Sequence, residues 1–375
     1  MKKQLMTIAT IATCLAQVNL NIVPSAPSLN NKGYILIAEN TGKIIAAQNA
    51  EQTIEPASLT KLMTLFIVAT ALEQKTISLE DQVLVSKKAW QQPGSRMFVK
   101  AGDHVSVKLL IQGSATVSGN DATVALAEHI AGSEEKFVEL MNATASKLGM
   151  KNTHFNNSTG LPTKNHLTTP HDLAILAEAW YKNYPEKTKW FAQKYFTYNK
   201  IKQHNRNQQL WSNKLVDGMK TGYTKAAGYC LVTAAKDGDE RLITVIAGAK
   251  SKNARFEQST QLLNYGFHFY TTKTLASPDL ALGTTPIYLG TKDNIAYTTN
   301  KPLIITSEKN STNVIKLTTQ LTSKLKAPIH KGEKIGTAEI SFGDYKNTVD
   351  IVAFEDVEKS GFFKQAISYG KMLLN

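Results

Sequence analysis

The sequence predicts an α+β protein whose central antiparallel sheet is built from strands at both ends of a long segment, with a helical layer inserted between them. Strand-like apolar runs come first, helix-like runs fill the middle, and strand-like runs return before a closing helix. After that helix, short β-rich runs alternate with turn residues, which indicates a separate small all-β domain. The C-terminal segment has the spacing of an amphipathic helix.

The strands expected in the sheet are short apolar runs bounded by polar turns. The first two flank the turn 39–42, which contains Gly42, and the last two flank the turn 236–239. The expected strands are 34–37, 43–47, 215–223, 228–235 and 241–249.

Helical spacing of apolar residues dominates the middle of this segment. The clearest case is the run from Leu62 to Leu72, whose apolar residues lie three or four positions apart and place a helix over 56–73. Further helices are expected over 107–113, 122–131, 136–148, 171–184 and 256–270.

The change in composition past Lys273 divides the chain. Short apolar runs such as 302–306, 314–317 and 350–354 alternate there with Gly, Pro, Asn and Lys turns. We therefore expect three units, listed in chain order: one large domain over 30–273, a β-sandwich-like domain over 274–356 and an amphipathic helix over 358–375.

The amphipathic helix predicts attachment to a membrane surface. Its apolar face would carry Phe362, Phe363, Ala366, Ile367, Gly370, Leu373 and Leu374, and its other face Lys364, Ser368, Lys371 and Asn375. At about 1.5 Å per residue the segment is too short to cross a bilayer, so we expect it to lie on an anionic membrane surface. The alternative is docking against its own β domain.

The N-terminal segment 1–26 resembles a secretory signal peptide followed by a linker. Two lysines precede a short apolar run, and Ala16 and Ala26 are candidate cleavage points. This predicts an exported protein. The alternatives are a buried N-terminal helix and, less favoured, lipid attachment at Cys14.

Net charge and cysteine content limit which partners the protein can bind and whether it can form disulfides. The chain carries a formal net charge of +13 at pH 7, which suits anionic lipid or cell-wall polymer. No basic run with interleaved aromatics indicates nucleic-acid binding. Cys14 and Cys230 are the two cysteines, so no internal disulfide is possible once a leader is removed. Cys230 lies in an apolar run, and we expect a buried, inert thiol.

Several familiar catalytic motifs are absent from the sequence. It contains no His-Glu-x-x-His zinc motif, no Gly-x-Ser-x-Gly elbow and no Gly-rich phosphate-binding loop. We therefore expect neither a metal nor a cofactor.

The segment Ser58-Leu59-Thr60-Lys61 begins a predicted helix and carries a possible nucleophile and base. Positions i and i+3 share a helix face, so the Lys61 amine would lie beside the Ser58 hydroxyl. An apolar site would favour the neutral amine, which can accept the serine proton. Taken alone, the pattern fits a helix-capping serine beside a solvated lysine better than it fits a nucleophile and base.

Two further motifs favour the interpretation of Ser58 and Lys61 as nucleophile and base. Ser118-Gly119-Asn120 lies between two predicted helices, and Lys220-Thr221-Gly222 lies on a predicted strand. Ser-x-x-Lys, Ser-x-Asn and Lys-Thr-Gly in this order are the signature of penicillin-binding proteins and class A β-lactamases. Three ordered motifs in suitable elements predict serine acyl transfer.

The chain resembles the low-molecular-weight penicillin-binding proteins, the D,D-carboxypeptidases of the penicillin-binding protein 5 type. The similar segments are 56–64, 118–122, 216–230, 325–328 and 361–363. The resemblance spans nearly the whole chain after the leader. It implies a β-lactamase/transpeptidase-like catalytic domain, with an antiparallel sheet and helical layers, followed by the β domain and the tail helix.

The resemblance also implies catalytic roles. Ser58 would attack the carbonyl between the last two D-alanines of a peptidoglycan stem peptide, and Lys61 would be the general base. Ser118 and Asn120 would relay protons and hold the substrate backbone, and Lys220 would support them electrostatically. β-Lactam antibiotics would acylate the same serine. The implied location is the periplasmic face of the inner membrane.

Substrate binding is implied for Thr221, Gly222, Tyr223 and Arg255. Thr221 and Arg255 would bind the terminal carboxylate, and the backbone N–H of Tyr223 would complete an oxyanion hole with that of Ser58. Tyr223 stands where family members often have His, which leaves ordinary strand packing as its alternative role.

Three other activities stay open. A D,D-endopeptidase would use the same residues on cross-links. A class A β-lactamase would need a Glu that activates water, and Glu139, on a predicted helix, fits a solvated helix face better. A non-catalytic wall-binding protein would not need the complete set of motif residues.

Overall fold

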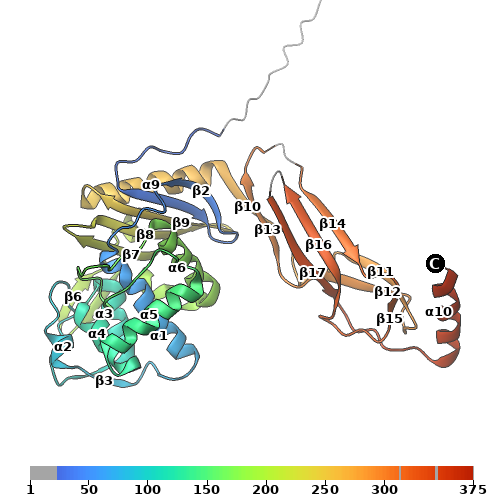
Figure 1. The fold of residues 1–375 in the computed structure, drawn as a ribbon, viewed down its shortest axis with the longest axis horizontal. Coiled ribbons are helices and arrows are strands. Elements are labelled where there is room, and N and C mark those ends of the chain that lie inside the picture. The colour runs from blue at the N-terminus through green and yellow to red at the C-terminus, as the bar shows by residue number, and fades with distance from the viewer. Residues whose placement is uncertain (1–22, 312–313, 343–344, 375) are drawn as a thin grey trace, which may run out of the picture.

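The computed structural model describes residues 23–311, 314–342 and 345–374. A large α+β unit is followed by a β unit, and a short helix stands at the far end of the β unit from the large one (Figure 1). The expected fold class is confirmed. The apolar core of the expected leader, including Cys14 and Ala16, lies outside the described residues.

The large unit is organised by one five-stranded sheet in which every neighbouring pair is antiparallel. Its order is β2-β1-β9-β8-β7, so the strands from the start of the chain lie beside those that follow the helices. The strands are β1 (Gly33–Ala38), β2 (Lys43–Gln48), β7 (Val216–Thr224), β8 (Gly228–Asp237) and β9 (Glu240–Ala249).

Strand β1 shows why the sheet is covered on both faces. Ile35 and Ile37 point into the core under the main helical layer, whereas Tyr34, Leu36 and Ala38 belong to the core under α9 (Lys252–Phe269). Alternate residues of a strand face opposite sides, so an entirely apolar strand needs a layer on each side.

The helical layer is formed by the chain between β2 and β7. Its longer helices are α1 (Lys61–Glu73), α3 (Val107–Val117), α4 (Asn120–Ala131), α5 (Glu134–Leu148) and α6 (Pro170–Asn183). Three of them begin after a Ser or Thr whose side chain accepts a hydrogen bond from the first turn, as helix starts require: Ser106, Ser133 and Thr169.

Short elements complete this unit. Apart from the 3-10 turn over 57–60, which lies within the helix expected over 56–73, they were not expected from the sequence, because they are too brief to show a period. The short helices are α2 (Lys87–Trp90), α7 (Lys189–Ala192), α8 (Gln209–Ser212) and the 3-10 turns η1 (Ala57–Thr60) and η2 (Pro185–Lys187). Two small hairpins pair β3 (Gln82–Leu84) with β4 (His104–Ser106), and β5 (Tyr195–Tyr198) with β6 (Ile201–His204).

The β unit has its own buried apolar core, and its main sheet has the order β14-β16-β17-β12-β11-β15. These strands are β11 (Gly283–Tyr288), β12 (Asn294–Thr299), β14 (Lys316–Leu321), β15 (Leu325–Lys326), β16 (Lys334–Phe342) and β17 (Tyr345–Ala353). Strand β10 (Tyr270–Ala276) continues directly from α9 and pairs with β13 (Leu303–Glu308). The boundary expected at Lys273 falls within β10.

The tail forms helix α10 (Phe362–Leu374), packed against β11 through its polar side. Ser368 Oγ accepts a hydrogen bond from Leu289 N at 2.7 Å, Lys364 Nζ donates to Thr291 O at 2.8 Å, and Met372 is buried. Phe362 and Phe363 are 82% and 85% exposed. Among the described residues, no helix combines the length and hydropathy needed to cross a membrane.

Candidate active site

The Ser-x-x-Lys motif spans the junction between η1 and α1. Ser58 lies in the 3-10 turn and is half-buried, and Lys61 is the first residue of α1 and is fully buried. The Lys61 amine lies 3.2 Å from Ser58 Oγ. The expected i, i+3 contact is therefore present, and a solvated lysine is excluded.

Two further acceptors fix the position of the Lys61 amine. It donates to Asn120 Oδ1 at 2.7 Å and to the main-chain oxygen of Thr159 at 2.6 Å. Burial holds the pKa of Lys61 well below its usual value, and the positive charge of Lys220 lowers it further, although Asp121 opposes them. Desolvation disfavours the ammonium form, so this environment favours an amine that can accept a proton.

The Ser-x-Asn motif forms the link between α3 and α4. Ser118 has a left-handed backbone, with φ of 64°, and Asn120 begins α4. Asn120 is held at both ends, because its N–H donates to Ser95 O at 2.7 Å and its Nδ2 to Pro93 O at 2.6 Å. The hydroxyl of Ser118 is buried and has no hydrogen-bond partner among the residues that the structure describes.

The Lys-Thr-Gly motif lies on β7, the edge strand beside the nucleophile turn. Lys220 is buried and its amine lies 3.1 Å from Thr221 O. Burial, together with the charges of Arg255 and Arg206, lowers the pKa of Lys220 to about 7. A methyl group on Gly222 would lie 3.1 Å from Pro56 O, a tight contact, so glycine favours the close approach of β7 to the turn that carries Ser58.

Arg255 and Tyr223 occupy different environments beside this strand. Arg255 is 5% exposed, and its Nη1 donates to Gly222 O at 3.1 Å. Burial lowers the pKa of Arg255 to about 10. Tyr223 is 54% exposed, and its ring centroid lies 4.4 Å from that of Tyr229. The tyrosine side chain is therefore available at the surface and is not part of the core.

Asp121 was not assigned a role from the sequence, although it lies inside the second matched segment. Its carboxylate is fully buried and accepts from Met97 N and Phe98 N, both at 2.9 Å, and from Val99 N at 3.3 Å. It fixes the segment that follows Pro93, which in turn holds Asn120. The sequence signal for this role is the position of an acidic residue in the first turn of α4.

His166 also supports the site, through Thr60 of the Ser-x-x-Lys motif. Its Nδ1 accepts from Asn156 N at 3.0 Å, so Nε2 carries the proton and donates to Thr60 Oγ1 at 2.8 Å. Thr60 Oγ1 then donates to Ala57 O at 2.8 Å, within η1. Burial lowers the pKa of His166 to about 4, which is consistent with this neutral form. Nothing in the local sequence marks this contact.

A cavity of about 660 Å³ adjoins the site, and Arg255 is one of its lining residues. Arg206, a second cation missed by the sequence analysis, lines the same cavity. The remaining lining residues are Tyr195, His204, Asn205, Gln208, Trp211 and Lys252. The cavity is thus both cationic and aromatic. The sequence analysis expected no catalytic role for Cys230 or Glu139. Cys230 is buried in β8, and Glu139 is exposed on α5.

Comparison with known families gives two matches. A family described as "D-alanyl-D-alanine carboxypeptidase" matches residues 21–251, and one described as "Penicillin-binding protein 5, C-terminal domain" matches residues 270–359. The D-alanyl-D-alanine carboxypeptidase DacC of Escherichia coli K12 is 41% identical, with 90% of this chain and 87% of that protein covered. DacA of the same organism is 35% identical, with 98% and 95% covered.

Solved structures agree with these matches. Penicillin-binding protein 5 of Haemophilus influenzae is 36% identical, with a TM-score of 0.79, and covers 90% of this chain and 100% of its own. The D-alanyl-D-alanine carboxypeptidase DacD of Francisella tularensis is 32% identical, with a TM-score of 0.72, and covers 92% and 98%.

Proposed function

Because the chain belongs to the D-alanyl-D-alanine carboxypeptidase family, we propose that it removes the terminal D-alanine from peptidoglycan stem peptides through an acyl-enzyme on Ser58. The observation that supports this best is the buried Lys61 amine, 3.2 Å from the Ser58 hydroxyl. A serine hydroxyl is a weak nucleophile unless an adjacent base accepts its proton.

In the proposed acylation, Ser58 Oγ attacks the carbonyl carbon between the last two D-alanines while its proton passes to Lys61 Nζ. The C–N bond then breaks, and the leaving amine receives a proton from Lys61, either directly or through the Ser118 hydroxyl. Water hydrolyses the resulting ester. Asn120, already bonded to Lys61 at 2.7 Å, would hold both the amine and the substrate backbone. A β-lactam would acylate Ser58 in the same way, except that the amine formed when its ring C–N bond breaks stays attached to the acyl group.

The remaining residues would bind the substrate. Thr221 and Arg255 would hold the terminal carboxylate, Lys220 would support Ser118 and Asn120 electrostatically, and Gly222 favours the close approach of β7 to Ser58. The N–H groups of Ser58 and Tyr223 would bind the developing oxyanion. The side chain of Tyr223, exposed beside Tyr229, would then contact the substrate without taking part in proton transfer.

A paired digestion tests this function. The protein and its Ser58→Ala variant are each incubated with a pentapeptide ending in D-Ala-D-Ala and with a purified cross-linked dimer. We expect free D-alanine from the pentapeptide with the unmodified protein and none with the variant. Equal release from both proteins would contradict the proposed role of Ser58.

The cavity beside Arg255 supports a second candidate function, D,D-endopeptidase activity. A single D-alanine bound at Arg255 would leave most of its roughly 660 Å³ unfilled, whereas cavities of this size hold larger ligands. The second stem peptide of a cross-link, which carries carboxylates, suits a cationic lining. In the paired digestion, Trp211→Ala should then reduce dimer cleavage more than D-alanine release. A dimer that is not cleaved by the unmodified protein excludes this candidate.

We further propose that the chain is exported and lies at the periplasmic face of the inner membrane, attached through α10. The polar side of α10 is occupied by its contacts with Leu289 and Thr291, and its apolar side is exposed. The β unit separates α10 from the catalytic unit (Figure 1). We propose that the domain over 274–356 holds the active site away from the anionic lipid surface.

A further inference from the structure

The loop 157–160, between α5 and α6, contacts the proposed general base through its main chain. Thr159 O accepts from Lys61 Nζ at 2.6 Å, and Ser158 O accepts from Thr64 Oγ1 at 2.7 Å. A methyl group on Gly160 would lie 1.8 Å from Ala57 O, so this loop also packs directly on η1. Any displacement of the loop would therefore move an acceptor of the Lys61 amine.

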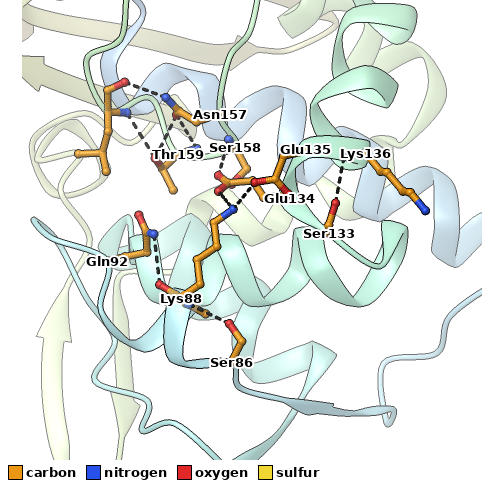
Figure 2. Close-up of polar contacts among 12 residues, drawn as sticks. Ser86, Lys88, Gln92, Ser133, Glu134, Glu135, Lys136, Asn157, Ser158 and Thr159 are labelled. Carbon is orange, nitrogen blue, oxygen red and sulfur yellow. Dashed lines mark hydrogen bonds and ion pairs between the residues drawn. The ribbon is translucent and has the colours of Figure 1, made fainter.

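Glu134 holds this loop from outside, as Figure 2 shows. Its Oε1 accepts from Ser158 N at 3.0 Å and from Ser158 Oγ at 2.7 Å. Inside the loop, Asn157 Oδ1 accepts from Thr159 N at 3.1 Å and from Gly160 N at 2.7 Å. The position of Thr159 O thus depends on the hydrogen bonds that the loop makes to Asn157 inside it and to Glu134 outside it.

The same carboxylate reaches the opposite side of the site. Glu134 Oε2 lies 3.0 Å from Lys88 Nζ on α2 (Figure 2). The segment that follows α2 provides the carbonyl groups of Pro93 and Ser95, which fix the side chain and backbone of Asn120. Glu134 therefore joins the two segments that hold the partners of the Lys61 amine, Asn120 and Thr159.

A comparison with its neighbour separates Glu134 from an ordinary acidic residue in the first turn of a helix. Both Glu134 and Glu135 follow the capping residue Ser133 and bind Lys88, and both suit the helix N-terminus. Glu135 is exposed, whereas Glu134 is 9% exposed and turned toward Ser158. Burying a carboxylate is unfavourable unless hydrogen bonds and a counter-charge compensate for it, and Glu134 has both.

We infer that Glu134 is a positioning residue for the acylation step, acting through Ser158 and Thr159 on the Lys61 amine and through Lys88 on the segment that holds Asn120. This inference rests on the proposed function of Lys61 as the base. The carboxylate does not exchange protons with the substrate.

The test measures acylation by a fluorescent penicillin in the full chain and in three variants. Glu134→Ala removes both the hydrogen bonds with Ser158 and the ion pair with Lys88. Glu134→Gln keeps an oxygen that can accept from Ser158, and Glu135→Ala is the matched control that leaves Ser158 untouched. For Glu134→Ala we expect the maximal acylation rate to fall by about tenfold to a hundredfold, because a displacement of about 1 Å near reacting groups costs up to about a hundredfold. Glu134→Gln should recover most of the loss, and Glu135→Ala should match the unmodified protein.

The pH profile of acylation separates positioning from general destabilisation. Weakening the bond from Lys61 to Thr159 O removes an acceptor that favours the ammonium form, so the acid limb of Glu134→Ala should move to lower pH. A Glu134→Ala protein with an unchanged rate and an unchanged acid limb would overturn the inference. So would a Glu135→Ala protein with an equal loss. Absence of labelling in the unmodified protein would instead contradict the proposed function itself.

Discussion

The catalytic unit and the tail helix depart from normal residue burial in opposite directions. The catalytic unit buries Lys61 and Lys220, whereas α10 exposes Phe362, Phe363 and Ile367. Charged side chains are seldom buried and clustered apolar side chains are seldom exposed, since both arrangements oppose folding. Burial lowers the pKa of the two amines, and under the proposed function the exposed apolar side chains would contact lipid. Each departure from normal burial marks a region that the proposed function needs.

The largest expected effect comes from removing the buried amine of Lys61. In Lys61→Met, acylation by penicillin should fall by about a hundredfold to ten-thousandfold, the range that general acid–base catalysis contributes. The unfolding temperature should change little, because the gain from removing a desolvated amine is offset by leaving Asn120 Oδ1 and Thr159 O without their donor. Penicillin-labelling kinetics and thermal unfolding check the two effects, with the exposed Lys147→Met as the control. A variant that loses both activity and stability would not fit a functional origin for this burial.

Changes on the exposed side of α10 should have a smaller effect, an about tenfold loss of binding to phospholipid vesicles. Replacing Phe362 and Phe363 by Ser should weaken binding to anionic phospholipid vesicles by about tenfold or more, since complete burial of one apolar side chain contributes about 1.5 to 3 kcal/mol. Acylation should not change. Leu280→Ser is a matched control, because Leu280 is an exposed apolar residue of the β unit outside α10. Vesicle sedimentation measures the effect, and equal binding by all three proteins would remove α10 as the attachment site.

The last expected effect is a change in how stability depends on pH. The folded state holds the pKa of Lys220 at about 7, below its unfolded value of about 10.4. Between these values the unfolded state binds more protons, so Lys220 makes the free energy of unfolding rise with pH. It should rise less steeply in Lys220→Met. Urea unfolding at several pH values from 7 to 10 provides the measurement, and parallel curves for the two proteins would show that Lys220 is not desolvated.

The site residues that the sequence predicted act through side chains in short motifs, whereas those that it missed act through main-chain atoms or helix packing. Ser58, Lys61 and Asn120 were predicted because short motifs fix side-chain types at fixed spacings, and the structure places Ser58 Oγ and Asn120 Oδ1 within hydrogen-bonding range of the Lys61 amine. Thr159 contributes a main-chain oxygen, which any residue type provides, so no residue preference marks it. The contact of Glu134 with Ser158 depends on how α5 packs, which the local sequence does not specify.

The fold shows the same division. Long periodic segments such as α1 and α6 were predicted near their observed bounds, and the alternation of apolar runs predicted the five strands of the main sheet. The hairpin of β5 and β6 was missed because its strands have only four residues each and Phe196 is their only buried residue. That hairpin provides Tyr195 and His204 to the cavity beside Arg255.

The central claim is that the Lys61 amine activates Ser58 for acylation, and one measurement tests it most directly. The protein is incubated with labelled penicillin across a range of pH, digested, and the adduct is located by peptide mass mapping. We predict a single adduct on Ser58, formed at a rate that rises with pH along an acid limb below the usual pKa of lysine. An adduct on another residue, or a rate on Ser58 that is unchanged in Lys61→Met, would contradict the account.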